Sequence, residues 1–464
     1  MQITFLGASG CVTGSMYYIE INQQRGLVDC GQYQGSPLEE KQNYSKLPFD
    51  TSHLDFIILT HAHIDHTGRL PLLVKNGFKG RVFCTYPTKA LTEILLRDSG
   101  KIHEADTAWD NKKRERAGLP KVAPLYTEDD AIIACQYLYP LNYEQTFELS
   151  STLLCRFVDA GHLLGSASVV MSFKEHEQWK TLTFSGDLGN NTNPLLKPTQ
   201  MIDQSDYLVM ESTYGDQIHA GVASRISKLM DIVKEATASK GTVIVPSFAI
   251  GRTQSLVFEI KQYLMQLPEN EAKLLSKVPI YIDSPLSLEA FNIYKEHLGY
   301  MRDGLTKNLF DMPQLKFIKT IEGSIALNRD TSPKVIISAS GMCDAGRVLH
   351  HLKHYLWREN THVVFIGFQA ETSMGRKIQE GQSPLHILGE TIAVKAQIHS
   401  ISGFSGHADQ DHLLKWRQHI KGVKTLFITH GEPPVSDAFA EILLMDDPKA
   451  DIIVPALDTS FTLE

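Results

Sequence analysis

The chain has 464 residues, 42% of them hydrophobic and 21% charged, a balance typical of a folded globular protein and not of a disordered one. Its 45 Lys and Arg residues are outnumbered by 53 Asp and Glu residues, and the net charge of −8 excludes a basic field over the whole surface, although not a local basic groove. No run approaches the ~18 apolar residues of a membrane span, and the start of the chain lacks the basic segment of a secretory signal.

Short strand-like runs dominate the first 210 residues, and many of them end in Gly, Asp or His. Strands punctuated in this way predict sheets whose loops gather at one edge. The runs are residues 3–7, 16–21, 26–31, 56–61, 81–85, 153–161, 168–173, 181–187 and 207–212.

From about residue 220 the pattern changes to helices that alternate with strands. Helical spacing covers 224–239, 252–267, 288–301 and 346–357, and strand-like runs cover 241–247, 279–285, 334–340 and 362–369. Such alternation predicts βαβ units and a mainly parallel sheet. After about residue 390 the first pattern returns. We therefore predict one α/β domain interrupted by a second α/β domain, with boundaries that give the segments 1–211, 212–390 and 391–464.

Four candidate metal ligands fall within the six residues HAHIDH, 61–66, directly after the predicted strand 56–60. A turn at the end of a strand can aim His61 and His63 at one metal ion and Asp65 and His66 at a second. Imidazole nitrogen and carboxylate oxygen at about 2.0–2.2 Å suit zinc. The alternative is a polar loop that is rich in His by chance, and the spacing of the four candidate ligands makes that the weaker explanation.

The HAHIDH segment resembles the metal motif of the metallo-β-lactamase superfamily, whose fold is an αββα sandwich. The resemblance extends to Asp29 in LVDCG, His162 in DAGHLLGS, Asp187 in FSGDLG and His430 in LFITHGE. It implies two zinc ions per chain, with Mn²⁺ as a substitute. By resemblance the first site is His61, His63, His162 and Asp187, and the second is Asp65, His66, Asp187 and His430.

Two details of this resemblance concern the chemistry. The members of the superfamily that bind di-iron for redox reactions resemble H-x-E-x-D, whereas the third position here is His63, which favours zinc and hydrolysis. Asp29 has no ligand-like neighbour, so we assign it a supporting catalytic role, orienting a ligand His or the attacking water through a hydrogen bond.

A second set of motifs narrows the family: ESTYG at 211–215, SFAIGRTQ at 247–254, DSPL at 283–286, ASGMCDAGR at 339–347 and GFSGHAD at 403–409. This set closely resembles the β-CASP group, whose members act on nucleic acids. The resemblance matches Glu211 to the acidic motif A, His407 to motif B and His430 to motif C. A His in motif C is typical of the RNA-acting members. The nearest look-alikes are bacterial and archaeal homologues of the endonuclease subunit of the cleavage and polyadenylation specificity factor.

Two loops of the inserted domain carry phosphate-binding chemistry. AIGRTQ follows a predicted strand and begins a predicted helix, whose free N–H groups can bind phosphate while Arg252 adds a charged fork. SASGM places small residues after another strand. A structural turn is the alternative for each loop. The candidate RNA phosphate contacts are Ser247, Gly251, Arg252, Thr253, Ser340, Gly341, Met342 and Arg347.

The sequence therefore predicts a zinc-dependent ribonuclease that cuts single-stranded RNA to 5′-phosphate and 3′-hydroxyl products, in RNA processing or decay. His407 is the expected general acid, Glu211 holds its tautomer, and Asp65 serves the metal centre. The endonuclease and 5′-exonuclease modes stay open, and so do a DNA substrate, a small-molecule metallohydrolase and a non-catalytic RNA-binding protein. The six cysteines form no C-x-x-C pair, so we expect reduced thiols in a cytoplasmic protein, with no membrane partner and with a homo-oligomer left open.

Overall fold

The computed structural model describes residues 1–370 and 372–463, which form two compact units. The first unit contains residues 1–191, 196–218 and 407–464, and the second contains residues 192–195 and 219–406. The second unit is thus inserted into the chain of the first. Its second boundary falls at 406/407, later than the 390/391 of the sequence analysis, because β19 (Gln397–Ser400) pairs with β16 (Thr361–Phe365) of the inserted sheet.

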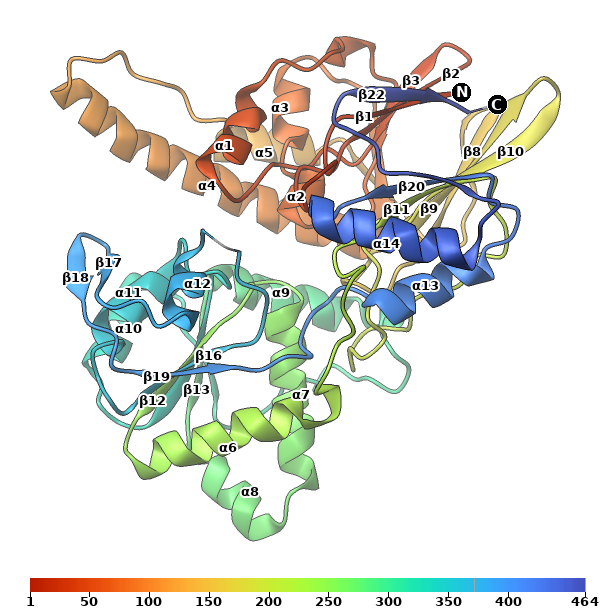
Figure 1. The fold of residues 1–464 in the computed structure, drawn as a ribbon. Coiled ribbons are helices and arrows are strands. Elements are labelled where there is room, and N and C mark those ends of the chain that lie inside the picture. Colours follow the sequence, from red (N-terminus) through yellow and green to blue (C-terminus); the bar gives the residue numbers. More distant parts are fainter. Residues whose placement is uncertain (371, 464) are drawn as a thin grey trace. The chain divides into compact units, whose positions relative to one another are not determined.

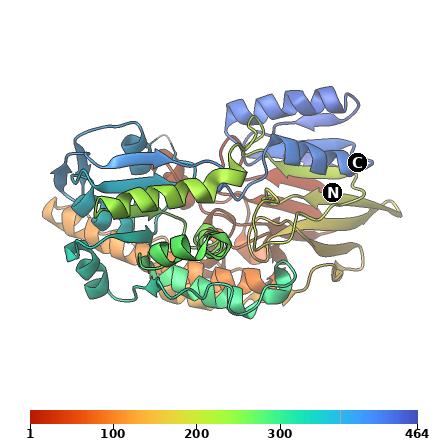
Figure 2. The same ribbon diagram turned by 90° about the horizontal axis from the view of Figure 1, so that it is seen from below.

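The first unit contains two seven-stranded sheets (Figure 1). In spatial order the first sheet consists of β22 (Thr459–Thr462), β1 (Gln2–Phe5), β2 (Tyr17–Ile21), β3 (Gln24–Val28), β4 (Phe56–Ile58), β5 (Arg81–Thr85) and β6 (Leu138–Leu141). The second sheet consists of β21 (Asp451–Ile453), β20 (Thr425–Thr429), β11 (Tyr207–Glu211), β10 (Gln178–Phe184), β9 (Ala167–Glu175), β8 (Leu153–Asp159) and β7 (Phe147–Ser150). The two chain ends lie side by side in both views, because β22 pairs antiparallel with β1 (Figure 2).

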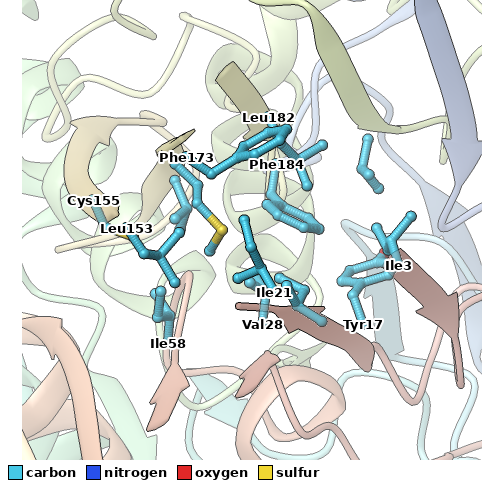
Figure 3. Packing of buried hydrophobic residues seen from close by; sticks show 14 of the residues in the cluster. Ile3, Tyr17, Ile21, Val28, Ile58, Leu153, Cys155, Phe173, Leu182 and Phe184 are labelled. Carbon is cyan, nitrogen blue, oxygen red and sulfur yellow. The ribbon is translucent and has the colours of Figure 1, made fainter. Parts of the chain in front are cut away.

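The two sheets pack face to face around one apolar core (Figure 3). Tyr17 and Val28 from the first sheet meet Phe173 and Phe184 from the second, and all four side chains are buried. Successive side chains of a strand point to opposite faces. Leu27, next to Val28, therefore lies in a different buried cluster on the outer face of the same sheet.

Helices cover the outer faces of this sandwich. The helices of the first unit are α1 (Pro37–Lys41), α2 (Ile64–Thr67), α3 (Leu70–Lys75), α4 (Tyr86–Arg116), α5 (Glu128–Cys135), α13 (Gln410–His419) and α14 (Pro433–Asp446). Leu73 of α3 and Leu96 of α4 pack with Leu27 on the first sheet, while Trp416 of α13 and Leu443 of α14 pack on the second. The predicted αββα sandwich is confirmed.

The second unit is built on an all-parallel sheet of six strands, as the alternating pattern predicts. In spatial order the strands are β14 (Leu315–Phe317), β13 (Ile280–Asp283), β15 (Lys334–Ser338), β12 (Thr242–Pro246), β16 and β19. A small hairpin joins β17 (Leu385–Ile387) to β18 (Glu390–Ile392). The helices are α6 (Arg225–Ala238), α7 (Arg252–Gln266), α8 (Glu269–Leu275), α9 (Pro285–Glu296), α10 (Ile321–Arg329), α11 (Arg347–Tyr355) and α12 (Met374–Gln379).

The helices that follow the neighbouring strands β12 and β15 lie on opposite faces of this sheet. Leu256 and Ile260 of α7 pack beside Val245, whereas Val348 and Leu352 of α11 pack in the cluster on the other face. The two connections therefore diverge at the carboxyl ends of β12 and β15. Open α/β sheets bind their ligands at such topological switch points. Among the described helices of the chain, none combines the length and apolar character needed to cross a membrane.

Candidate functional site

The candidate metal ligands of the first unit lie where strands end. His61 follows β4, His162 follows β8, Asp187 follows β10 and His430 follows β20. The strands β8, β10, β11 and β20 all run in one direction, so their carboxyl ends meet at one edge of the second sheet. The topology thus brings together residues that are far apart in the sequence.

The first cluster contains His61, His63, His162 and Asp187. His63 Nδ1 lies 3.0 Å from His61 Nε2 and 3.3 Å from His162 Nε2. Asp187 Oδ2 lies 3.4 Å from His61 Nε2 and 3.6 Å from His162 Nε2. Tetrahedral ligands at zinc bond lengths stand roughly 3.4 Å from one another, so the spacing of these four atoms matches one zinc ion.

The second cluster contains Asp65, His66, Asp187 and His430. His66 Nε2 lies 3.3 Å from both His430 Nε2 and Asp187 Oδ1. His430 Nε2 lies 3.5 Å from Asp65 Oδ2 and 3.6 Å from Asp187 Oδ1. Asp187 therefore offers one oxygen to each cluster, which is the arrangement of a carboxylate that bridges two metal ions.

The state of Asp187 shows that these residues fit a pair of cations. Its side chain is 2% exposed, and Oδ1 is buried without a hydrogen-bond partner among the described residues. A buried carboxylate oxygen without a partner is costly unless a cation neutralises it. Imidazole nitrogen with carboxylate oxygen, four donors to each cluster, is the donor set of zinc.

Hydrogen bonds behind the ligands fix their orientation. His66 Nδ1 donates to Asp29 Oδ2 at 2.7 Å, and the other oxygen of Asp29 accepts from the Thr60 backbone N–H at 2.8 Å. The Thr60 hydroxyl donates to Asp29 Oδ2 and lies 3.1 Å from His61 Nδ1. Asp29 thus has the surroundings that its expected orienting role requires. A side chain at Gly31 would collide with the backbone of Asp65, so only glycine permits this close packing.

His407 lies beside both clusters and is held by Glu211. His407 Nδ1 donates to Glu211 Oε2 at 3.2 Å, and Glu211 is otherwise held by the Leu188 N–H and the Thr213 hydroxyl, each at 2.6 Å. The His407 side chain is 21% exposed, in contrast to 4% for His430. Its imidazole is therefore both oriented from behind and open to a substrate.

Thr60 and Thr213 are functional-site residues that the sequence analysis missed. Thr213 Oγ1 lies 2.6 Å from Glu211 Oε2 and 3.0 Å from His430 Nδ1, so one hydroxyl connects the partner of His407 with a candidate metal ligand. Thr60 stands beside His61 in the run LTH, and Thr213 lies within the motif ESTYG, two residues after Glu211. A hydroxyl beside a ligand was the only available signal.

The electrostatics of the site divide four of its histidines into two groups. Burial, followed by the neighbouring His66, lowers the pKa of His61 well below its ordinary value. Burial likewise lowers the pKa of His63 to about 4. Burial acts in the same direction on His66 and His407, but the surrounding carboxylates outweigh it. Asp187 and Asp29 raise the pKa of His66 well above its ordinary value, and Glu211 and Asp187 raise the pKa of His407 to about 9.

The loop after β12 brings together four of the candidate RNA contacts. The helix α7 begins at Gly251 without a side-chain cap, so its first N–H groups are not satisfied by a capping side chain. Arg252 stacks on the ring of Phe248, 4.8 Å from the ring centre. Ser247 and Thr253 are buried, and their hydroxyls bond to each other at 2.9 Å, so they shape the loop from inside.

The loop after β15 contains the other four candidate contacts. Ser340, Gly341 and Met342 lie in the turn between β15 and α11. Like α7, the helix α11 has no side-chain cap at its N-terminus. Arg347 is paired with the buried carboxylate of Asp283 at 2.6 Å, and its guanidinium also donates to two carbonyl oxygens. Arg347 is therefore anchored to the sheet, with 21% of its side chain exposed.

Comparison with known families covers most of the chain. Residues 9–131 match the model of the metallo-beta-lactamase superfamily, residues 253–378 match the Beta-Casp domain, and residues 391–455 match the Zn-dependent metallo-hydrolase RNA specificity domain. The last of these ranges contains both His407 and His430.

Similar proteins extend over nearly the whole chain. Ribonuclease TTHA0252 of Thermus thermophilus is 34% identical, over 96% of both chains. Transcription termination factor FttA of Methanocaldococcus jannaschii is 30% identical, over 95% of this chain and 68% of its own length. A chain of Enterococcus faecalis described as a protein of unknown function has a TM-score of 0.53 at 13% identity, covering 100% and 99% of the two chains, which shows the fold alone. The clusters and these matches agree, and the protein belongs to the β-CASP ribonuclease family of metallo-β-lactamase hydrolases, which are metal-dependent enzymes.

Proposed function

We propose that this protein is a zinc-dependent ribonuclease that hydrolyses single-stranded RNA to products with a 5′-phosphate and a 3′-hydroxyl. The observation that carries the proposal is the pair of four-ligand clusters that share Asp187, with His430 in the second cluster. The relative from Thermus thermophilus that bears the name ribonuclease, and the RNA specificity model matched over His407 and His430, support RNA as the substrate.

Two zinc ions per chain are the proposed cofactor, with Mn²⁺ as a substitute. The first ion is assigned to His61, His63, His162 and Asp187, and the second to Asp65, His66, Asp187 and His430. When bound, such a pair supplies Lewis-acid stabilisation of the phosphoryl oxygens and lowers the pKa of the attacking water. The chain's part is to hold the ligand geometry, and Asp29 contributes by fixing the ring of His66.

His407 is the proposed general acid for the leaving 3′ oxygen. Glu211 and Asp187 raise the pKa of His407 to about 9, so the ring is charged near neutral pH: Nδ1 donates to Glu211, and the second ring nitrogen carries the proton that can be transferred. Glu211 stabilises the charged imidazolium and fixes its orientation, and Thr213 fixes Glu211 in turn. Water attacks phosphorus and loses a proton to the solvent, the P–O3′ bond breaks, and the leaving oxygen takes the proton from His407. These events leave a 5′-phosphate and a 3′-hydroxyl.

The second unit is the proposed binding surface for the RNA backbone. The helices α7 and α11 begin beside each other, after the adjacent strands β12 and β15, and neither has a side-chain cap. Backbone N–H groups at helix N-termini bind phosphate. The proposed contacts are Gly251, Arg252, Ser340, Gly341 and Met342. Ser247 and Thr253 shape the loop after β12 from inside. Arg347 can contact RNA only with the part of its side chain that remains exposed beside Asp283.

We place the protein in the reducing cytoplasm, because all six cysteines are free. A homo-oligomer stays among the proposed partners, together with single-stranded RNA.

End-labelled single-stranded RNA incubated with the purified, zinc-loaded protein tests the proposal. We expect cleavage that a chelator abolishes and that added Zn²⁺ or Mn²⁺ restores, with fragments that bear a 5′-phosphate. A ladder, free mononucleotides or internal cuts distinguish an endonuclease from a 5′-exonuclease. DNA of the same sequence and a thioester are the comparison substrates. Turnover of the thioester without cleavage of RNA would refute the proposal and identify a small-molecule hydrolase.

A further inference from the structure

Two phenylalanine side chains are exposed at the carboxyl edge of the parallel sheet in the second unit. Phe248 follows β12 and is 38% exposed, and Phe368 follows the adjacent strand β16 and is 49% exposed. Large apolar side chains in a folded unit are mostly buried, so two aromatic rings left open at the edge where α/β sheets bind ligands call for an explanation.

A chain of contacts joins these rings into one patch. The Arg252 guanidinium lies over the Phe248 ring at 4.8 Å. It also lies against the backbone of Gly367, where a Cβ atom would stand 1.9 Å from Nη1. Gly367 is the neighbour of Phe368 in the chain, so the same arginine lies over one ring and against the backbone segment that carries the other. We call Phe248, Arg252 and Phe368 the aromatic patch.

Backbone contacts hold the patch against the loop after β15. The side chain of Gln369 is buried and donates to the carbonyl oxygen of Gly341 at 2.9 Å. A Cβ atom at Gly341 would meet the Phe248 ring at 3.2 Å, so the glycine backbone packs directly on that ring. The aromatic patch therefore borders both loops that are proposed to bind RNA phosphates, and its position is fixed by packing.

The chemistry of the patch matches a nucleobase better than other apolar ligands. Every base has a planar face that stacks on an aromatic ring, and single strands are bound by combining such rings with positive charge for the backbone. Here the arginine lies over one exposed ring and against the segment that carries the other, beside two uncapped helix N-termini. An unstacked base next to a bound phosphate would therefore find an aromatic face.

We propose that Phe248 and Phe368 form a base-stacking subsite for single-stranded RNA, an inference that rests on the proposed ribonuclease function. Every base can stack on an aromatic ring, so the subsite favours any base over an abasic chain. Larger rings stack more strongly, so it also favours purines over uracil. It also favours single strands over duplexes, whose bases are already stacked.

The test compares binding of two ligands by the zinc-loaded full chain: a 2′-O-methyl oligoadenosine, which resists cleavage, and an abasic ribose-phosphate chain of equal length. We expect the wild type to bind the oligoadenosine about 5- to 150-fold more tightly for each stacked base. The double variant Phe248→Leu, Phe368→Ala should lose most of this preference, and Phe368→Trp should keep it. Arg252→Ala should weaken the binding of both ligands, because it removes a phosphate contact.

Trp357→Ala is the matched control. Trp357 is 53% exposed, and Arg358 lies 5.4 Å from its ring centre, but the pair stands after α11 and before β16, at the other edge of the sheet. The control should keep the base preference, and thermal unfolding of each variant shows whether it is folded. A folded double variant that keeps the preference would overturn the subsite alone. A wild type that neither binds nor cleaves RNA would overturn the proposed function, and the subsite with it.

Discussion

Replacing Thr213 by Val should selectively weaken the second metal site. The hydroxyl of Thr213 lies 2.6 Å from Glu211 Oε2 and 3.0 Å from His430 Nδ1, and His430 is a candidate ligand only in the second cluster. Valine keeps the shape of the side chain and removes both contacts. Loss of a hydrogen bond behind a ligand His lowers metal affinity about 10- to 100-fold, or roughly 1.4–2.8 kcal/mol.

Zinc titration against a chelator of known affinity measures this effect. One of the two zinc ions should be lost at a higher free-zinc concentration than in the wild type, while the first cluster, whose histidines Thr213 does not contact, keeps its affinity. Thr213→Ser retains the hydroxyl and should restore the second ion. If the Val variant held both ions as tightly as the wild type, or lost both equally, the link between Thr213 and His430 would have no energetic role.

Three further predictions concern residues with separate roles. His407→Ala should keep both zinc ions and RNA affinity while single-turnover cleavage falls roughly 10²- to 10⁴-fold, and His412→Ala is the nearby control; loss of zinc in the first variant would contradict its role. Arg252→Ala should lose about 1.5–3 kcal/mol of RNA binding and lower the salt dependence by one phosphate contact, and wild-type binding would argue against that contact. Burial raises the pKa of Asp159 to about 7. The folding free energy lost by burying its charged carboxylate is therefore absent below pH 4 and grows as the pH rises to 7. Asp159→Asn should therefore stabilise the protein by at most roughly 4 kcal/mol at pH 8 and by little at pH 4, as measured by denaturant unfolding at both values.

The candidate ligands that the structure brings together could be named from the sequence because their signal is local. Four candidate ligands in the run HAHIDH, and single residues at the ends of apolar runs, can be recognised without any knowledge of the fold. The topology then determines which strand ends meet, and the parallel direction of β8, β10, β11 and β20 is not written in any one segment. Family resemblance supplied that step for the ligands. It supplied nothing for Thr60 and Thr213, whose hydroxyls act only through neighbours that are remote in sequence.

In the inserted unit, contacts between distant residues change what the sequence predicts for Arg347 and Phe248. Arg347 was expected to contact RNA, and the structure shows that its guanidinium forms an ion pair with Asp283, 64 residues earlier in the chain. Phe248 lay within the predicted motif SFAIGRTQ, yet an apolar residue after a strand predicts burial. Arg252 lies over the ring and the Gly341 backbone packs on it, yet these contacts leave the residue 38% exposed. Such outcomes depend on contacts between loops, which local patterns do not encode.

Removal of zinc should weaken RNA binding as well as cleavage, because of the charge at the centre. Asp29, Asp65, Asp187 and Glu211 gather there, in a protein whose formal charge is −8. Two divalent cations add four positive charges, so the loaded protein stands at −4, and the change is concentrated where a phosphate must approach. Exposed charges are screened over about 10 Å at 0.1 M salt. The affinity for uncleavable RNA should therefore fall on chelation at low salt, and the loss should shrink as salt is added. Equal affinity of the loaded and chelated protein at every salt concentration would show that the RNA does not approach this centre.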